Sequence, residues 1–146
     1  MNRKNLDIVV RNLLEIYPPL MKKINTGDYI KQFELTPNLT RILFILKFQS
    51  ELSLSELSDR MVMSRSNCSR AVDNLEKNDY VKRKTDPQDK RKTLLVLTEA
   101  GEKTVEDLNR KIREEIKVHM SELSEEDIMT LKKASEQIHE VLSKLN

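Results

Sequence analysis

The fold is decided by residues 53–76, which read SLSELSDRMVMSRSNCSRAVDNLE. Ser53 followed three residues later by Glu56 forms a capping-box pattern, which is typical of a helix start. Ser64 is a second candidate N-cap. The helix that it opens has an apolar face made of Cys68, Val72 and Leu75. The segment therefore predicts two short helices joined by a tight turn, the second running from Ser64 to Glu76.

The opposite face of the second helix carries short polar and basic side chains, whereas an ordinary solvated helix is richer in Glu and Lys. Its candidate DNA-contacting residues are Ser64, Arg65, Ser66, Asn67, Ser69, Arg70 and Asn74. Short side chains let a helix lie deep in the major groove, where Arg recognises guanine and Asn recognises adenine through paired hydrogen bonds. The free amides at the helix N-terminus also favour a phosphate. We therefore expect this helix to be a recognition helix.

A β-hairpin is predicted directly after this helix. Residues 80–84 and 93–97 are enriched in β-branched, aromatic and Leu residues and flank the turn-forming residues 85–89. Residues 82–94 would form a wing with Lys90, Arg91 and Lys92 near its tip. Basic side chains placed there can follow the DNA backbone or enter a minor groove. An ordinary solvated hairpin with a charged turn is the alternative.

Charge is distributed unevenly along the chain. The net charge is only +2, yet residues 60–92 hold ten Lys and Arg against five Asp and Glu. A phosphate backbone responds to such a local concentration of positive charge more than to the total. A merely solvated basic face is the competing interpretation.

Amphipathic helices are predicted on both sides of this central segment. Thr36 and Pro37 read as the start of a helix that runs to about Phe48. Residues 6–24 repeat apolar side chains at helical spacing, but Pro18 and Pro19 predict a kink or a break near Tyr17.

Two long amphipathic helices follow the hairpin, capped by Thr98 and by Ser124. The chain is too short to cover both faces of such helices, so we expect them to pair with a second copy of the chain. With 2 Gly and 4 Pro in 146 residues, the composition predicts a mainly α protein with a small β-hairpin wing.

Several classes of protein are disfavoured by the composition. Neither a signal sequence nor a run of about 20 apolar residues is recognisable, and a lone cysteine, Cys68, forms no internal disulfide, so a cytoplasmic protein without a membrane span is expected. Recognisable catalytic motifs are lacking, and we expect no enzyme activity and no cofactor. His119 and His139 lie on different predicted helices without a Cys/His cluster, which disfavours a metal site.

The order of elements and motifs resembles the multiple-antibiotic-resistance regulator (MarR) family of winged helix-turn-helix transcription factors over nearly the whole chain. The resemblance rests on Leu35 and Thr36, residues 64–76, Tyr80 to Arg83, Asp89 to Arg91, and Leu97 to Gly101. It implies a single domain, 1–146, in which about 1–34 and 100–146 are dimerisation helices and about 35–99 form the DNA-binding lobe.

By this resemblance, the chain would be a homodimeric, ligand-responsive repressor that binds a palindromic operator in double-stranded DNA. Arg91 matches the wing arginine of the family, and Asp89 matches the acidic residue that steadies the wing. Asp79 departs from the pattern, because a glycine commonly precedes the first wing strand; Asp tolerates a left-handed backbone at some cost. A winged-helix module that binds only protein is the alternative function.

Three aromatic residues form a candidate effector site. The aromatic residues Tyr17, Tyr29 and Phe33 lie in the segment that links the dimerisation helices to the DNA-binding lobe, where relatives bind a small aromatic or anionic effector. Aromatic residues there also serve as plain core, because a kinked helix needs bulky groups on its concave side. For Cys68, on the inner face of the recognition helix, a buried structural role is favoured over a redox role.

Overall fold

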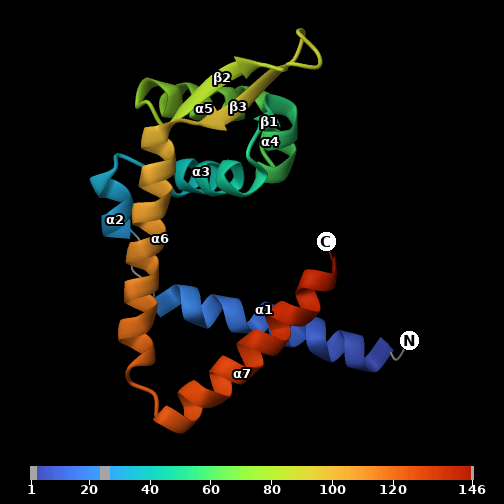
Figure 1. Cartoon of the computed structure of the whole chain (residues 1–146), viewed down its shortest axis with the longest axis vertical. Helices are drawn as coiled ribbons and strands as arrows, with labels where there is room; N and C mark the ends of the chain where they lie inside the picture. Colours follow the sequence, from blue (N-terminus) through green and yellow to red (C-terminus); the bar gives the residue numbers. More distant parts are fainter. Residues whose placement is uncertain (1–2, 24–26, 146) are drawn as a thin grey trace. The chain divides into compact units, whose positions relative to one another are not determined.

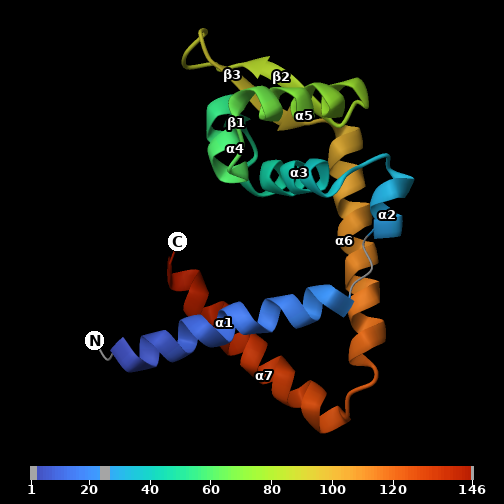
Figure 2. The same cartoon turned by 180° about the vertical axis from the view of Figure 1, so that it is seen from behind.

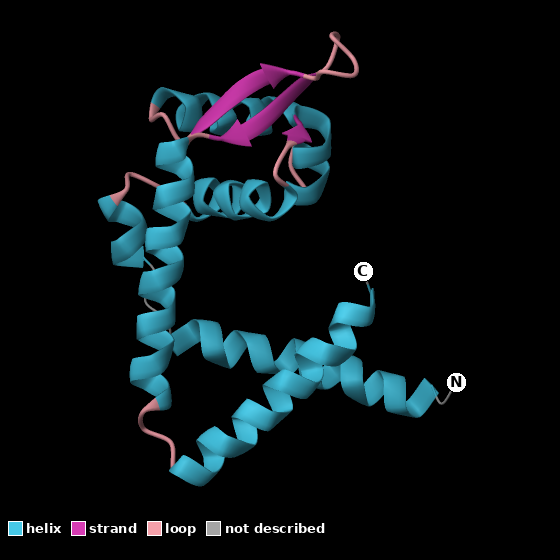
Figure 3. Ribbon diagram, in the orientation of Figure 1, coloured by secondary structure: helices cyan, strands magenta, loops and turns pink. Residues whose placement is uncertain are grey.

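The computed structural model describes residues 3–23 and 27–145, with side chains for residues 4–16, 27–28 and 30–145. The chain divides into two compact units: Asn25–Ile112 is one, and Met1–Ile24 with Arg113–Asn146 is the other. Helices dominate, with a small sheet confined to the first of these units (Figure 3). Below, the unit Asn25–Ile112 is called the lobe, and the other is called the helical unit.

The lobe is a helix-turn-helix backed by a three-stranded sheet (Figure 1). Its elements are α2 (Gly27–Gln32), α3 (Pro37–Gln49), β1 (Leu52–Ser53), α4 (Leu54–Met61), α5 (Arg65–Lys77), β2 (Val81–Thr85), β3 (Thr93–Leu97) and the first part of α6 (Glu99–Met120). The antiparallel strands lie in the order β1-β3-β2. Val81 pairs with Leu97 and Thr85 with Thr93, so β2 and β3 form the predicted hairpin.

Local capping fixes the helix boundaries that the sequence predicts. Thr36, Ser53, Ser64 and Ser124 are all N-caps whose side chains accept a hydrogen bond from a backbone N–H in the first turn. Ser53 and Glu56 form the reciprocal capping box. Thr98 Oγ1 likewise accepts from Gly101 N at 3.0 Å at the start of α6.

The end of α5 depends on a left-handed residue. Tyr80 N donates to Leu75 O (2.9 Å) and Asp79 N to Glu76 O (2.9 Å), which is the Schellman arrangement, and Asp79 has φ 59°. Glycine is the residue that usually meets this demand, since it has no Cβ to clash. The expected left-handed turn at Asp79 is therefore confirmed.

One hydrophobic core holds the lobe together. Its buried side chains come from every element of the lobe: Ile30, Leu35, Leu39, Ile42, Leu43, Leu46, Leu52, Leu57, Met61, Cys68, Val72, Leu75, Val81, Leu95, Leu97, Val105 and Leu108. The inner face of α5 is fully buried in it, and α5 packs beside β2 (Figure 2). Because this face is buried, the orientation of the opposite face is fixed.

The helical unit contains α1 (Arg3–Lys23), the end of α6, α7 (Glu125–Leu142) and a short 3-10 helix, η1 (Ser143–Leu145). None of the side chains described in α1, residues 4–16, is buried, and α7 has no buried residue. Over the part of the chain that the structure describes, no helix is long and apolar enough to cross a membrane.

Three details differ from the expectations. Of the kink or break expected near Tyr17, the break is wrong, because the backbone of α1 is helical from Arg3 to Lys23, through Pro18 and Pro19. Proline's fixed φ is itself helical, although each proline removes one amide donor. The short helix α2 lacks an apolar repeat long enough to predict it. Strand β1 was not expected. It has only two residues, and they form a strand because Leu52 pairs with Leu95 and Ser53 with Leu94 of β3.

Candidate nucleic-acid interface

The outer face of α5 is a row of exposed, short polar side chains. Cys68, Val72 and Leu75 are fully buried on the inner face, and this forces the intervening residues outward. Ser64, Arg65, Ser66, Asn67, Arg70 and Asn74 are exposed, and Ser69 is half-buried. The structure thus gathers all seven predicted residues of this helix on one side of the lobe.

The two arginines of this face are held by neutral partners. Arg65 Nη2 donates to Ser55 Oγ at 2.6 Å, and Arg70 Nη2 donates to Asn67 Oδ1 at 2.5 Å. Neither guanidinium forms an ion pair with any residue that the structure describes. Their positive charge is therefore not cancelled, and the partners orient the two side chains without competing for an anion.

The first turn of α5 adds hydrogen-bond donors to this face. Ser64 Oγ accepts from Asn67 N at 3.3 Å and lies 3.2 Å from Ser66 Oγ. No acidic residue lies in that first turn. A helix N-terminus carries partial positive charge, so the electrostatics at this end of α5 favour an anion.

The wing tip is built by two aspartates that accept from the backbone. Asp86 Oδ1 accepts from Gln88 N (2.8 Å), and Asp89 Oδ1 accepts from Arg91 N (3.1 Å). Lys92 N also donates to Asp89 O at 2.8 Å. Aspartate side chains that accept in this way fix tight turns. The tip projects away from the body of the lobe (Figure 1), with Lys90, Arg91 and Lys92 exposed.

A groove of about 810 Å³ separates the wing from the start of α4. Arg65, Arg91 and Lys92 line it together with Ser55, Thr93, Gln88 and the acidic residues Glu51, Glu56 and Asp86. The groove brings the basic wing and the N-terminal end of α5 to one place, which the sequence alone does not establish. Ser55 is a residue of this groove that the sequence reasoning missed, since its role depends on the contact with Arg65, ten residues away.

Arg83 is a second residue that was missed. It lies on β2 and forms ion pairs with Asp73 and Glu76 of α5, at 2.8 Å for Asp73 Oδ1. The hydrogen bond from Arg83 to Asp73 raises the pKa of the guanidinium, so the side chain stays charged. Its partners lie ten and seven residues earlier in the chain and on another element, so no helical or strand periodicity links them to Arg83. No local sequence signal therefore identifies the contact.

The other candidate residues lie apart from this surface or outside the described side chains. Burial raises the pKa of the Cys68 thiol, which favours a structural role for this residue. Phe33 packs against the hydrophobic core, and its carbonyl oxygen accepts a hydrogen bond from Tyr80 Oη at 3.2 Å. The side chains of Tyr17 and Tyr29 lie outside the described residues. Over residues 3–23 and 27–145, no group of three His, Cys, Asp or Glu side chains could hold a metal ion.

Comparison with known proteins finds similarity to transcriptional regulators. Residues 35–93 match the family model described as the MarR family. An uncharacterized HTH-type transcriptional regulator of Bacillus subtilis, YfiV, is 26% identical over 129 residues, which cover 87% of this chain and 81% of that protein. The similarity to this protein therefore extends well beyond residues 35–93.

Solved structures show the same fold. MepR of S. aureus, in a complex with DNA, is similar with a TM-score of 0.68 and 25% identity, covering 90% of this chain and 96% of that chain. NadR in complex with 4-hydroxyphenylacetate has a TM-score of 0.62 and 23% identity, covering 89% of this chain and 91% of that chain.

Proposed function

We propose that this chain is a MarR-family repressor that binds a palindromic operator in double-stranded DNA as a homodimer, since residues 35–93 match the MarR family model and a relative over most of the chain is an HTH-type transcriptional regulator. The observation that carries the proposal is the outer face of α5, where Arg65 and Arg70 keep uncancelled charge among short polar side chains. A protein that binds the chromosome acts in the compartment that holds it, which in a bacterium is the cytoplasm.

The assignment of roles follows the arrangement of the lobe. Arg65, Asn67 and Arg70 would contact base edges or phosphates in the major groove, since a helix fits that groove and these side chains form paired hydrogen bonds with bases. Ser64, Ser66, Ser69 and Asn74 would contact the backbone beside them. Lys90 and Arg91 would follow the backbone from the wing, whose tip Asp89 holds in shape.

The dimer would form through the helical unit. The exposed apolar residues of α1 and α7 are the supporting observation, because a monomer rarely leaves so many apolar side chains in water. On this proposal the residues up to about 34 and from about 100 onward, which include both ends of the lobe, serve dimerisation, and those between them bind DNA. Two lobes related by a two-fold axis fit a palindromic site.

The proposal also includes a small-molecule effector. NadR binds 4-hydroxyphenylacetate, which is an aromatic carboxylate. We infer that a small aromatic or anionic molecule could bind near Tyr17, Tyr29 and Phe33 and release DNA. It would do so only if it binds the free and the DNA-bound conformations unequally. Tyrosine fluorescence followed during titration of aromatic carboxylates, together with DNA affinity, tests this step.

The experiment that tests DNA recognition begins with the selection of duplexes from a random pool by the wild-type protein. We expect an enriched palindrome whose affinity falls steeply with added salt, because neutralised phosphates release counterions. Arg70→Ala should weaken binding to it by about 1 to 3 kcal/mol. Arg41→Ala is the matched control, since Arg41 is exposed on α3 of the same lobe and is not among the residues that line the groove.

The alternative is a winged-helix module that binds only protein. It predicts that no duplex is enriched and that any residual DNA binding is weak and equal for all sequences. An Arg70→Ala variant that folds normally and binds the selected duplex with unchanged affinity would remove α5 from the major groove.

A further inference from the structure

Arg83 joins the wing to the recognition helix. From the middle of β2, opposite Leu95 of β3, its guanidinium reaches α5 and binds both Asp73 and Glu76. The next residue, Lys84, pairs with Glu51 just before β1. Successive residues of a strand point to opposite faces, so β2 is held from both sides by ion pairs.

The two carboxylates that Arg83 binds lie on the proposed DNA-contacting helix. Asp73 and Glu76 belong to the helix that we propose to lie in the major groove, where negative charge is repelled by phosphates. The side chain of Asp73 is 58% exposed, which leaves much of its charge facing solvent. Arg83 is the cation that the structure places against both groups, so it neutralises the acidic end of the outer face of α5.

Arg83 also stands where the hairpin leaves the body of the lobe. Val81, two residues earlier, is buried in the core, whereas every residue from Lys82 to Thr85 is exposed. Strand β2 is an edge strand whose pairing partner is β3 alone, and β1 supports β3 only at Leu94 and Leu95, opposite Lys84 and Arg83. The ion pairs with α5 are therefore the contacts best placed to fix the direction of the wing relative to the recognition helix.

We propose that Arg83 is a positioning residue for DNA recognition, which sets the wing against α5 so that Arg91 and Arg70 engage one duplex at the same time. This proposal rests on the proposed function. Arg83 acts through its carboxylate partners and need not touch DNA. The opposing explanation is a direct contact between Arg83 and a DNA phosphate. It predicts that neutralising Asp73 and Glu76 strengthens DNA binding, whereas a positioning role predicts that it weakens DNA binding.

The first arm of the experiment removes the partners of Arg83 and keeps its charge. The probe is the duplex that the wild-type protein selects from a random pool. Electrostatics alone predicts that Asp73→Asn with Glu76→Gln tightens binding, because two negative charges leave the DNA-facing helix. If Arg83 positions the wing, binding should instead weaken by roughly tenfold, a coupling typical of residues in one ion-pair network.

A matched control is present in the same lobe. Lys47 of α3 binds Glu102 and Glu106 of α6, which is also one cation shared by two carboxylates. Glu102→Gln with Glu106→Gln removes the same charge without touching the wing, and we expect it to leave duplex affinity unchanged or slightly higher. Equal behaviour of the two double variants, or tighter binding by the Asp73 and Glu76 variant, would overturn the proposal.

The second arm is a double-mutant cycle between Arg83→Gln and Arg91→Ala. If Arg83 positions the wing, the wing of Arg83→Gln no longer holds Arg91 against the duplex. The loss of duplex affinity caused by Arg91→Ala should therefore be roughly fivefold smaller in the Arg83→Gln background than in the wild type. Additive losses would mean that the two arginines act independently, which contradicts the proposal. Circular dichroism and melting of each variant verify folding, and Arg83→Lys, which keeps the positive charge, should recover part of the affinity.

Failure of this inference and failure of the proposed function give different results. A wild-type protein that enriches no duplex contradicts DNA recognition itself. A wild-type protein that enriches a palindrome, combined with additive losses in the cycle, contradicts only the role of Arg83. If Arg83→Gln does not fold, the variant of Asp73 and Glu76 decides the question alone, since it removes no positive charge.

Discussion

At the residue scale, four helix ends in the lobe place a non-glycine residue at positive φ, where glycine is favoured: Glu34, Ser50, Val62 and Asp79. Val62 follows α4 with φ 54° and ψ 48°, and Asp79 follows α5 with φ 59°. Val62 N donates to Asp59 O (3.2 Å) and Met63 N to Ser58 O (3.1 Å), the same Schellman pattern as at Asp79. A β-branched side chain is especially unfavourable in this conformation, because its Cβ substituents crowd the backbone.

We expect Val62→Gly to raise the free energy of unfolding by about 1 to 2 kcal/mol, the penalty of a left-handed L-residue. The Val62 side chain is 88% exposed, so its removal loses almost no packing. Val62→Ala keeps a Cβ and should gain less, which makes it the control. Urea denaturation of the three proteins measures the differences. A lower stability of Val62→Gly would show that the valine side chain contributes more than its backbone strain costs.

At Gly101 we expect substitution to lower the stability of the fold, because there is no room for a side chain. A Cβ at this position would lie 2.0 Å from Tyr80 O and 3.3 Å from Leu97 Cδ2. Helix propensity alone predicts that Gly101→Ala stabilises α6 by about 1 kcal/mol. We expect a loss of about 2 to 3 kcal/mol instead, since the backbone at Tyr80 must move. Thermal melting compared with Ala100→Gly, at an exposed neighbour, decides between these signs.

At the element scale, the helix starts could be predicted from the sequence because capping is local. Ser64 and Asn67, three residues apart, contain all the information needed to place the start of α5. Strand β1 and the contact of Arg83 with Asp73 could not be predicted, because both depend on partners brought close only by the folded chain. The outer face of α5 was predictable, while the groove beside the wing required the relative placement of α4 and the hairpin.

The capping box of α4 gives a prediction about pH. Hydrogen bonds from the Ser53 side chain and N–H lower the pKa of Glu56 below its ordinary value of 4.5. A carboxyl whose pKa is lowered by folding stabilises the fold above its unfolded pKa, and this stabilisation is lost as the pH falls through the folded pKa. We therefore expect Glu56→Gln to be less stable than the wild type at pH 7, with the difference closing below about pH 4.5.

Urea titrations at several pH values measure this difference, and Ser53→Ala supplies the control. Without the Ser53 hydroxyl, which is 2.6 Å from Glu56 Oε2, the effect of Glu56→Gln at pH 7 should be smaller. Ser53→Ala itself should cost about 1 kcal/mol as the loss of an N-cap. A difference between wild type and Glu56→Gln that does not change with pH would contradict the ionised capping box.

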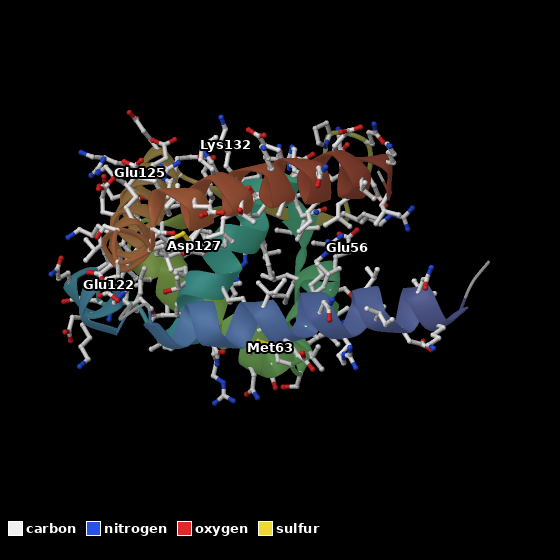
Figure 4. The ribbon with its side chains drawn as sticks, turned by 90° about the horizontal axis from the view of Figure 1, so that it is seen from below. Glu56, Met63, Glu122, Glu125, Asp127 and Lys132 are labelled. Atoms are coloured by element: carbon white, nitrogen blue, oxygen red, sulfur yellow. The ribbon has the colours of Figure 1, made fainter. Side chains whose placement is uncertain are left out.

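At the scale of the whole molecule, the main question is what covers the apolar side chains of the helical unit. Ile128, Leu131, Ile138, Val141 and Leu145 are all exposed, although they recur at helical spacing along α7 and η1. Glu125 and Lys132, seven residues apart, project from one edge of α7 (Figure 4). The helix is thus amphipathic, yet none of its residues is buried, which is the property expected of a surface that is buried in a dimer.

Deletion of residues 135–146 should abolish the dimer, because Ile138, Val141 and Leu145 are removed together. Analytical ultracentrifugation measures the change in mass. Point variants separate this effect from a general loss of folding: Ile138→Asp places a charge in the apolar stripe and should dissociate the dimer, whereas Lys132→Asp changes charge at the opposite edge and should not. Since DNA binding would use two lobes at once, monomeric variants should also lose most affinity for a palindromic duplex while keeping the weaker affinity for a half-site. If the truncated protein and Ile138→Asp both sediment as dimers, α7 is not the interface, and the apolar stripe of α1 becomes the surface to test.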